Sequence, residues 1–228
     1  MTKQVKSKQR VADHGEVFTA EREVKAMCDL VADECLRIDS RFLEPACGDG
    51  NFLAEILGRK LDVVSARYKK SPYDWERNAL LALGSIYGVE LLLDNVLTCR
   101  ERLFKLWDER YKKAVKKKEQ NEDVRESARY ILGLNIICGN ALSLHCVDEA
   151  GQDTDIPIIF SKWAFATGPM MKREDYIFED LLHKVEPKED YQQTSLDFTQ
   201  EQSDEDEGTL IMIYPPIHYR RLKEYARK

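Results

Sequence analysis

The chain has 228 residues, a formal net charge of −6, 43% hydrophobic residues and 33% charged residues. That length suits one large domain with appendages, and it lets a core bury roughly 70% of the unfolded surface without a metal or a disulfide. The acidic balance excludes a protein that coats nucleic acid by bulk electrostatics alone, although a local basic face or a basic partner stays open.

The six cysteines have no CxxC spacing and the four histidines are scattered, so we expect buried free thiols and no bound metal. The first ten residues lack the apolar segment of a signal peptide, and no apolar run approaches 18 residues. These features predict a soluble protein of a reducing cytoplasm that does not enter a membrane.

In the first part of the chain, residues 1–13 are polar and basic and are expected to form a flexible arm. Apolar residues then recur with helical spacing through 19–35. A short strand is predicted at 41–44, a glycine loop follows it, and a helix covers 51–57. Residues 58–75 are expected to be a polar insertion.

In the middle of the chain, a helix at 75–86 leads to a second strand at 87–91. A long helix follows, and charged residues dominate from 112 to 126. We therefore expect a solvated helical projection at about 93–130, with contact to nucleic-acid phosphates as the alternative for its lysines. A third strand is predicted at 134–138.

Toward the end of the chain, a fourth strand is predicted at 156–160 and a short helix at 174–183. Residues 186–208 are expected to be an acidic disordered linker, and 209–228 a C-terminal tail. Because strands alternate with helices, the domain at 14–185 is expected to be α/β, with a parallel sheet and helices on its faces.

The glycine loop follows the first strand and precedes a helix, which is where a parallel sheet binds ligands. Gly48 and Gly50 allow the backbone to turn sharply and to approach a ligand, and the helix N-terminus offers N–H groups to a carboxylate. Glu44 can meet a ligand ammonium, and Asp49 favours a cationic ligand over a pyrophosphate. The methionine end of S-adenosylmethionine presents such an ammonium and carboxylate.

The next two strands also end in polar residues. Glu90 can accept hydrogen bonds from both ribose hydroxyls, and the amide of Asn140 suits an adenine edge. Structural alternatives remain, because Gly50 can serve helix packing alone and Glu90 can be a surface carboxylate. A nicotinamide enzyme is a further alternative, although the loop is not GxGxxG.

Four segments together resemble the amino-type (adenine-N6) DNA methyltransferases of restriction–modification systems. Residues 42–53 closely match the S-adenosylmethionine loop of that family, while 15–20, 87–91 and 135–142 resemble its preceding, ribose and adenine motifs. Thr19-Ala20 replaces the usual Thr-Pro. The resemblance covers roughly 14–145, which is the cofactor-binding part only.

This resemblance implies a Rossmann-like methyltransferase fold with an incomplete sheet and S-adenosylmethionine as cofactor. The residues that it implies for cofactor binding are Phe18, Thr19, Glu44, Pro45, Ala46, Cys47, Gly48, Asp49, Gly50, Phe52, Glu90, Leu91, Asn140 and Ala141.

The family's catalytic motif, Asn- or Asp-Pro-Pro-Tyr, holds the flipped adenine and is not found in this sequence. Residues 166–170 stand at the expected distance but have one proline, and 214–217 have two prolines without the amide. A structural polyproline turn is the preferred interpretation of Pro215-Pro216. No catalytic residue is therefore assigned.

Three functions remain open. The chain can be the cofactor-binding half of a split adenine methyltransferase, whose partner protein supplies the catalytic loop and recognises DNA. The alternatives are a regulatory module without catalysis, and a self-contained methyltransferase with an atypical active site. In the first case, the partner is expected to contact an apolar surface formed by Trp163, Phe165, Met170 and Met171. For Trp163 and Phe165, a core or interface position is preferred to a base-stacking platform.

Overall fold

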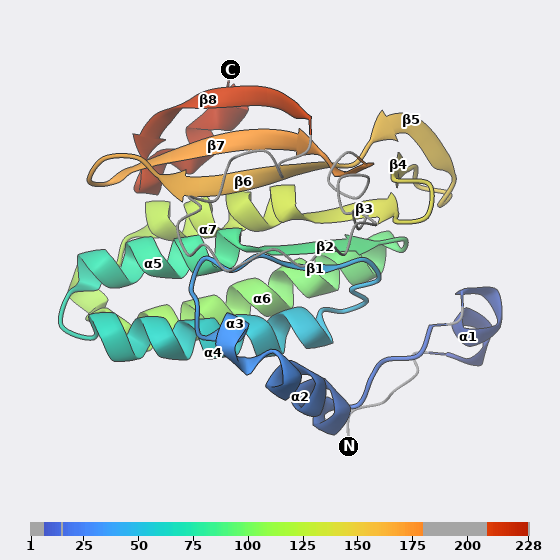
Figure 1. The fold of residues 1–228 in the computed structure, drawn as a ribbon, viewed down its shortest axis with the longest axis horizontal. Helices are drawn as coiled ribbons and strands as arrows, with labels where there is room; N and C mark the ends of the chain where they lie inside the picture. Colours follow the sequence, from blue (N-terminus) through green and yellow to red (C-terminus); the bar gives the residue numbers. More distant parts are fainter. Residues whose placement is uncertain (1–6, 15, 180–208, 228) are drawn as a thin grey trace, which may run out of the picture.

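The computed structural model describes residues 7–14, 16–179 and 209–227, and it forms two sheets (Figure 1). The first sheet has the order β1-β2-β3-β4-β5 and the second the order β6-β7-β8. The strands of the first sheet are β1 Phe42–Glu44, β2 Ile86–Glu90, β3 Ile136–Asn140, β4 His145–Val147 and β5 Asp153–Pro157. Those of the second are β6 Ile159–Phe165, β7 Met170–Ile177 and β8 Leu210–His218.

The helices surround the first sheet and separate it from the second. They are α1 Lys8–His14, α2 Glu21–Leu30, α3 Ala32–Cys35, α4 Asn51–Tyr68, α5 Pro72–Gly84, α6 Leu93–Ala114, η1 Lys117–Glu119, α7 Glu122–Asn135 and η3 Tyr219–Arg227. Figure 1 shows α4 and α6 on one face of β1–β3, and α5 and α7 between the two sheets. Every residue of β2 is buried, as expected for a parallel strand covered on both faces.

The first sheet is mixed, whereas the sequence predicts a parallel one. Strands β1, β2 and β3 are parallel, but β4 and β5 continue the sheet in antiparallel fashion. Leu144 turns the chain at a left-handed φ of 64° between β3 and β4. A short turn of this kind suffices for an antiparallel neighbour, whereas a parallel one needs a long crossover. The strand predicted at 156–160 is divided at Ile158 between β5 and β6.

The predicted polar insertion at 58–75 is wrong, because α4 continues to Tyr68 and α5 already begins at Pro72. The apolar face of α4 extends through Leu57, Leu61 and Val64, all fully buried. Polar residues of the outer face alternate with these apolar residues along the sequence, so the segment looks polar unless it is examined with helical periodicity.

The predicted projection at 93–130 is also wrong, because α6 and α7 pack against each other and against the other helices. Trp107, Tyr111 and Ala128 are fully buried. The charged residues lie around this core, where Asp108 forms ion pairs with Lys112 and Arg125. The Asp108–Lys112 pair joins neighbouring turns of α6, and the Asp108–Arg125 pair joins α6 to α7. Such pairs allow a highly charged sequence to form packed helices.

The helix predicted at 174–183 is wrong for its first residues, because β7 runs through Ile177; residues 178–179 are helical, and the remainder lies outside the described residues. Alternation explains the strand, because Arg173 and Asp175 lie on one face and are joined by a bidentate ion pair. The predicted acidic linker at 186–208 lies outside the described residues. Within the segment predicted as a flexible arm, residues 8–14 form helix α1.

The C-terminal residues form an integral part of the fold rather than a tail. Strand β8 is an edge strand, and its pairing with β7 shifts register at Pro215-Pro216, where missing N–H groups are tolerated. In η3, the Tyr219 hydroxyl and the Arg220 guanidinium each donate to the buried carboxylate of Glu76, at 2.6 Å. The Tyr111 hydroxyl donates to the other oxygen of Glu76 at 2.7 Å.

No helix among the described residues combines the length and the apolar character that crossing a membrane requires.

Lys60 is fully buried in α4, beneath the start of β1. Its ammonium donates to the backbone oxygens of Ile38 and Ser40 and to the Ser85 hydroxyl, so it joins the segment before β1 to the end of α5. Burial lowers the pKa of Lys60 to about 8. The native protein therefore holds this proton less tightly than the unfolded chain does.

We predict that the stability of the wild type, relative to Lys60→Met, rises with pH between about 8 and 10.5. Below that window Lys60 is charged in both the folded and the unfolded protein, so the cost of burying the ammonium is fully present. Above the window Lys60 is neutral in both, and this cost is gone. The gain should approach about 3 kcal/mol, since one pKa unit corresponds to about 1.4 kcal/mol. Urea unfolding across this range measures it, with exposed Lys70→Met as the control. A difference between wild type and Lys60→Met that does not change with pH would contradict the shifted pKa.

Candidate functional site at the strand ends

Glu44, Glu90 and Asn140 end three adjacent parallel strands at one edge of the first sheet. In the register, Glu44 pairs with Gly88, and Glu90 pairs with Cys138. Each strand thus ends two residues beyond its neighbour, a step of about 6–7 Å along the strand. The three polar residues predicted from the sequence therefore form a stepped row at the carboxyl edge of the sheet.

The loop between β1 and α4 has the sharp turns that its glycines predict. Gly48 and Gly50 have φ values of 53° and 87°, and the Gly50 N–H donates to Cys47 O at 2.8 Å. A Cβ on Gly50 would lie 2.6 Å from the Cys99 sulfur. Gly50 is thus required both by its backbone conformation and by the close approach of α6, so the packing role considered as an alternative is present.

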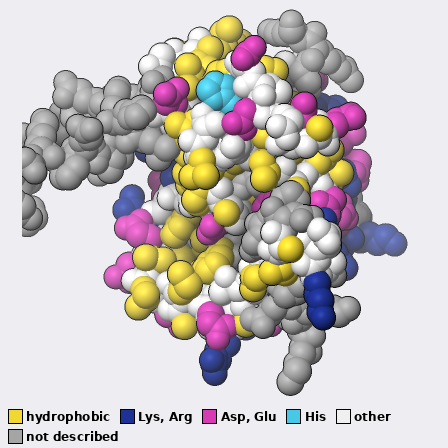
Figure 2. Space-filling view, turned by 90° about the vertical axis from the view of Figure 1, so that its right-hand side faces the viewer, with side chains coloured by type: hydrophobic (Ala, Val, Ile, Leu, Met, Phe, Trp, Pro, Cys, Tyr) yellow, Lys and Arg dark blue, Asp and Glu magenta, His cyan; other side chains and the backbone are white. Residues whose placement is uncertain are grey.

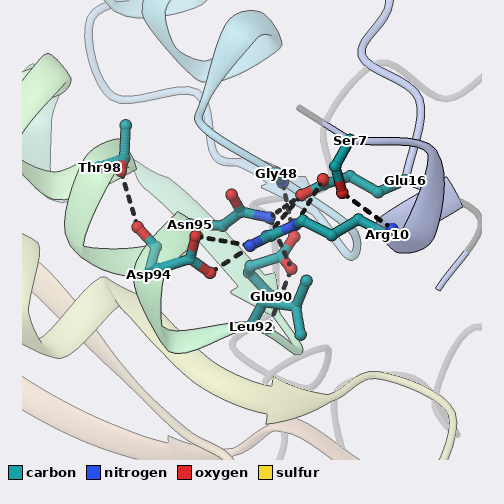
Figure 3. Close-up of polar contacts among 9 residues, drawn as sticks. All are labelled: Ser7, Arg10, Glu16, Gly48, Glu90, Leu92, Asp94, Asn95 and Thr98. Carbon is teal, nitrogen blue, oxygen red and sulfur yellow. Dashed lines mark hydrogen bonds and ion pairs between the residues drawn. The ribbon is translucent and has the colours of Figure 1, made fainter. Parts of the chain in front are cut away.

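Glu90 joins the glycine loop to the start of α6 (Figure 3). Its carboxylate accepts hydrogen bonds from the backbone N–H groups of Gly48 at 2.8 Å and Leu92 at 3.0 Å. A third donor is the side-chain amide of Asn95, at 3.3 Å. Glu90 is only 9% exposed, so the alternative of a surface carboxylate is wrong. It is a buried acceptor at the place predicted for ribose, with most of its capacity used within the chain.

The N-terminal segment adds residues that the sequence analysis missed. Arg10 binds Glu16 through two bonds of 2.7 Å and Asp94 through bonds of 2.8 and 3.1 Å. Asn95 donates to Glu16 at 2.7 Å as well as to Glu90. Both carboxylates raise the pKa of Arg10. A polar Asn95 beside Val96 in a buried stripe was a usable sequence signal, whereas nothing marked Arg10.

Glu44 is half-buried and differs from Glu90 in its partners. Burial raises its pKa, and a hydrogen bond from the Ala46 backbone opposes that shift. Among the described residues, no cation contributes to the shift. Desolvated carboxylates are usually paired with a cation, so Glu44 has the chemistry to receive a positively charged ligand group. Asp49, by contrast, already pairs with Arg102 at 3.2 Å.

Asn140 uses its amide within the chain. Its nitrogen donates to the Asp153 carboxylate at 3.0 Å, and its oxygen accepts the Leu142 N–H at 3.0 Å. The second bond closes a side-chain turn of the kind that Asn favours. Asn140 therefore shapes the turn into β4, and an adenine edge would have to compete with these contacts.

The other predicted cofactor residues divide between two places. Phe18, Thr19 and Asp49 line a groove of about 720 Å³ between α2, α4 and α6, together with Arg102 and Lys105. Cys47 is buried in the core beside Cys99. The contact with the Cys99 thiol and burial both raise the pKa of Cys47, so its thiol stays protonated. Half-buried Phe52 packs on the same core, whereas Pro45, Ala46, Leu91 and Ala141 remain accessible at the strand ends.

The face around the strand ends is apolar. Leu91, Leu93, Leu97 and Leu142 follow β2 and β3 in the chain and are 36%, 49%, 54% and 96% exposed. Figure 2, which views the molecule from this side, shows hydrophobic side chains between acidic ones. Among the described residues, no group of three or more His, Cys, Asp or Glu side chains could hold a metal.

The two segments weighed as catalytic loops lie in the second sheet. Residues 166–169 form the β6–β7 turn and 214–217 lie in β8. In Figure 1, helices α5 and α7 separate this sheet from β1–β3, and the β6–β7 turn lies at the end opposite the strand ends. Trp163 and Met171 are 4% and 0% exposed, so the expectation that they contact a partner is wrong; the core interpretation of Trp163 is confirmed.

Comparison with protein-family models, with curated proteins and with solved structures gives no significant match.

We predict that Gly50→Ala destabilises the protein by about 2–4 kcal/mol, because the new Cβ meets the Cys99 sulfur and the φ of 87° is unfavourable for alanine. Gly58→Ala, in the helix that follows this loop, is the control. Nothing lies within 4 Å of its added Cβ, so it should be neutral or stabilise by up to about 1 kcal/mol. Urea unfolding of both variants compares them. Equal stability would show that the loop does not make this turn.

Proposed function

We propose that this chain binds S-adenosylmethionine at the carboxyl ends of β1, β2 and β3, in a Rossmann-like arrangement. The observation that carries the proposal is the stepped row formed by Glu44, the glycine loop and Glu90. Open α/β sheets bind ligands at this edge. The uncompensated carboxylate of Glu44 suits the cationic methionine end, and Glu90 lies one strand further, where a ribose would follow.

We further propose that the chain is one half of a DNA adenine-N6 methyltransferase, and that a partner chain brings the catalytic loop. Three observations support this division. The motif that holds the adenine is not found in the sequence. The segments closest to it lie behind α5 and α7, away from the strand ends. Among the described strands, β1 pairs with β2 alone and forms one edge of its sheet, and a partner chain would approach the strand ends from this edge.

The surface around the site favours a protein partner over direct contact with DNA. Four exposed leucines lie around the strand ends, with acidic side chains between hydrophobic ones on this face (Figure 2), and the chain carries a net charge of −6. Specific DNA interfaces are strongly positive. The partner would therefore supply the contacts to phosphate and to the target base, while this chain presents the methyl group.

We predict that S-adenosylmethionine binds the isolated protein and that Glu44→Gln weakens binding about 10-fold or more, because a charge-assisted contact is lost. Affinity in the wild type should rise as pH increases through the raised pKa of Glu44 and then level off, since only the ionised carboxylate attracts the cation. Calorimetry between pH 4.5 and 8 measures both effects, with exposed Glu149→Gln as control. Folded wild-type protein that gives no binding heat and no thermal shift at millimolar ligand would reject the cofactor.

We also predict that the chain alone does not transfer methyl groups to duplex DNA. Extruding a base costs a few kcal/mol, and the contacts that offset this cost come from a pocket that the described residues do not form. Tritiated methyl transfer to mixed genomic DNA tests the chain alone and then with the protein encoded beside it. Incorporation by the pure chain would overturn the split enzyme. Cofactor binding without transfer in either case would favour a regulatory module.

A further inference from the structure

The N-terminal residues lie on the same groups that the proposed cofactor would contact. Phe18 approaches the glycine loop so closely that a Cβ on Gly48 would lie 3.1 Å from its ring. Glu16 shares the amide of Asn95 with Glu90, and its side chain is only 7% exposed. Glu90 itself is 9% exposed. A ribose therefore cannot reach this carboxylate while Glu16 holds its present position.

Arg10 joins the N-terminal residues to α6 through a second set of contacts. Its guanidinium forms one bidentate pair with Glu16 and another with Asp94, in the first turn of α6. A backbone bond from Glu16 N to Arg10 O, at 3.4 Å, closes the loop between them. Figure 3 shows Arg10 reaching from α1 across the end of β2. The closure thus depends on an ion pair 84 residues apart in sequence.

We propose that residues 8–14 together with Glu16 form an autoinhibitory strap, held by Arg10, that occupies the nucleoside end of the site and must be displaced before the cofactor binds. This inference rests on the proposed function of the site. A protein whose binding-competent state is only partly populated binds its ligand more weakly by that fraction. The Asp94 side chain is 56% exposed, so the pair that holds the strap is weak enough to open.

The test compares Arg10→Ala with Arg22→Ala, whose side chain is 92% exposed and pairs with adjacent Glu23. The probe is S-adenosylhomocysteine, and calorimetry and stopped-flow measure its affinity and association rate. Arg10→Ala should bind about 3- to 10-fold more tightly and associate faster, because the strap is already released. Arg22→Ala should bind as the wild type does. Thermal unfolding of both variants shows that they are folded.

Hydrogen exchange gives a second, independent reading of the wild-type strap. Ligand should accelerate exchange at residues 8–16 while slowing it at 44–50. Slower exchange at 8–16, or weaker binding by Arg10→Ala, would show that this segment is a wall of the site and would overturn the strap. Equal binding by both variants would overturn it too, with the cofactor proposal intact. Absence of binding in every variant would reject the cofactor proposal and the strap together.

Discussion

The buried carboxylate of Glu90 is the constraint on which this edge of the molecule depends. It accepts backbone hydrogen bonds from both sides, from Gly48 in the loop after β1 and from Leu92 at the start of α6. A buried carboxylate is stable only when such donors satisfy it. The loop, the second strand and the helix that follows are therefore fixed relative to one another before any ligand arrives, and Asn95 extends this order to the N-terminal segment.

The second sheet packs against the first through helices that are buried on two faces. Helices α5 and α7 contact β2 on one side and β6 on the other. Gly84 at the end of α5 permits this closeness, since a Cβ there would lie 2.9 Å from the Trp163 ring. The layer keeps β6–β8 away from the strand ends. Any chemistry at those ends therefore depends on residues of the first sheet and its loops, and on a partner that approaches along the edge of β1.

The sequence predicted the strand–loop–helix core because its signals are local. Gly48 and Gly50 mark the turn, and Glu44 and Glu90 each end an apolar run. The part of α4 beyond residue 57 was missed because the buried face of this helix includes Lys60; α5 was predicted at 75–86, but the burial of Glu76 within it was not. These groups are stable inside only because distant partners satisfy them, and a single sequence does not pair positions far apart. For the same reason Arg10 was assigned to a flexible arm. The C-terminal part of β7 was predicted as a helix because its buried face carries the charged residues Arg173 and Asp175, which a sequence pattern does not identify as buried.

The cluster around Glu76 has a consequence for how the chain folds during synthesis. Tyr219 and Arg220 reach this carboxylate across 143 and 144 positions. Until those residues leave the ribosome, a carboxylate between α5 and α6 lacks two of its three described side-chain partners, and the exposed side of α7 lacks Leu222 and Tyr225. Contacts this distant in sequence form late and slowly. The packing around α5 and α7 can therefore close only after η3 has been synthesised.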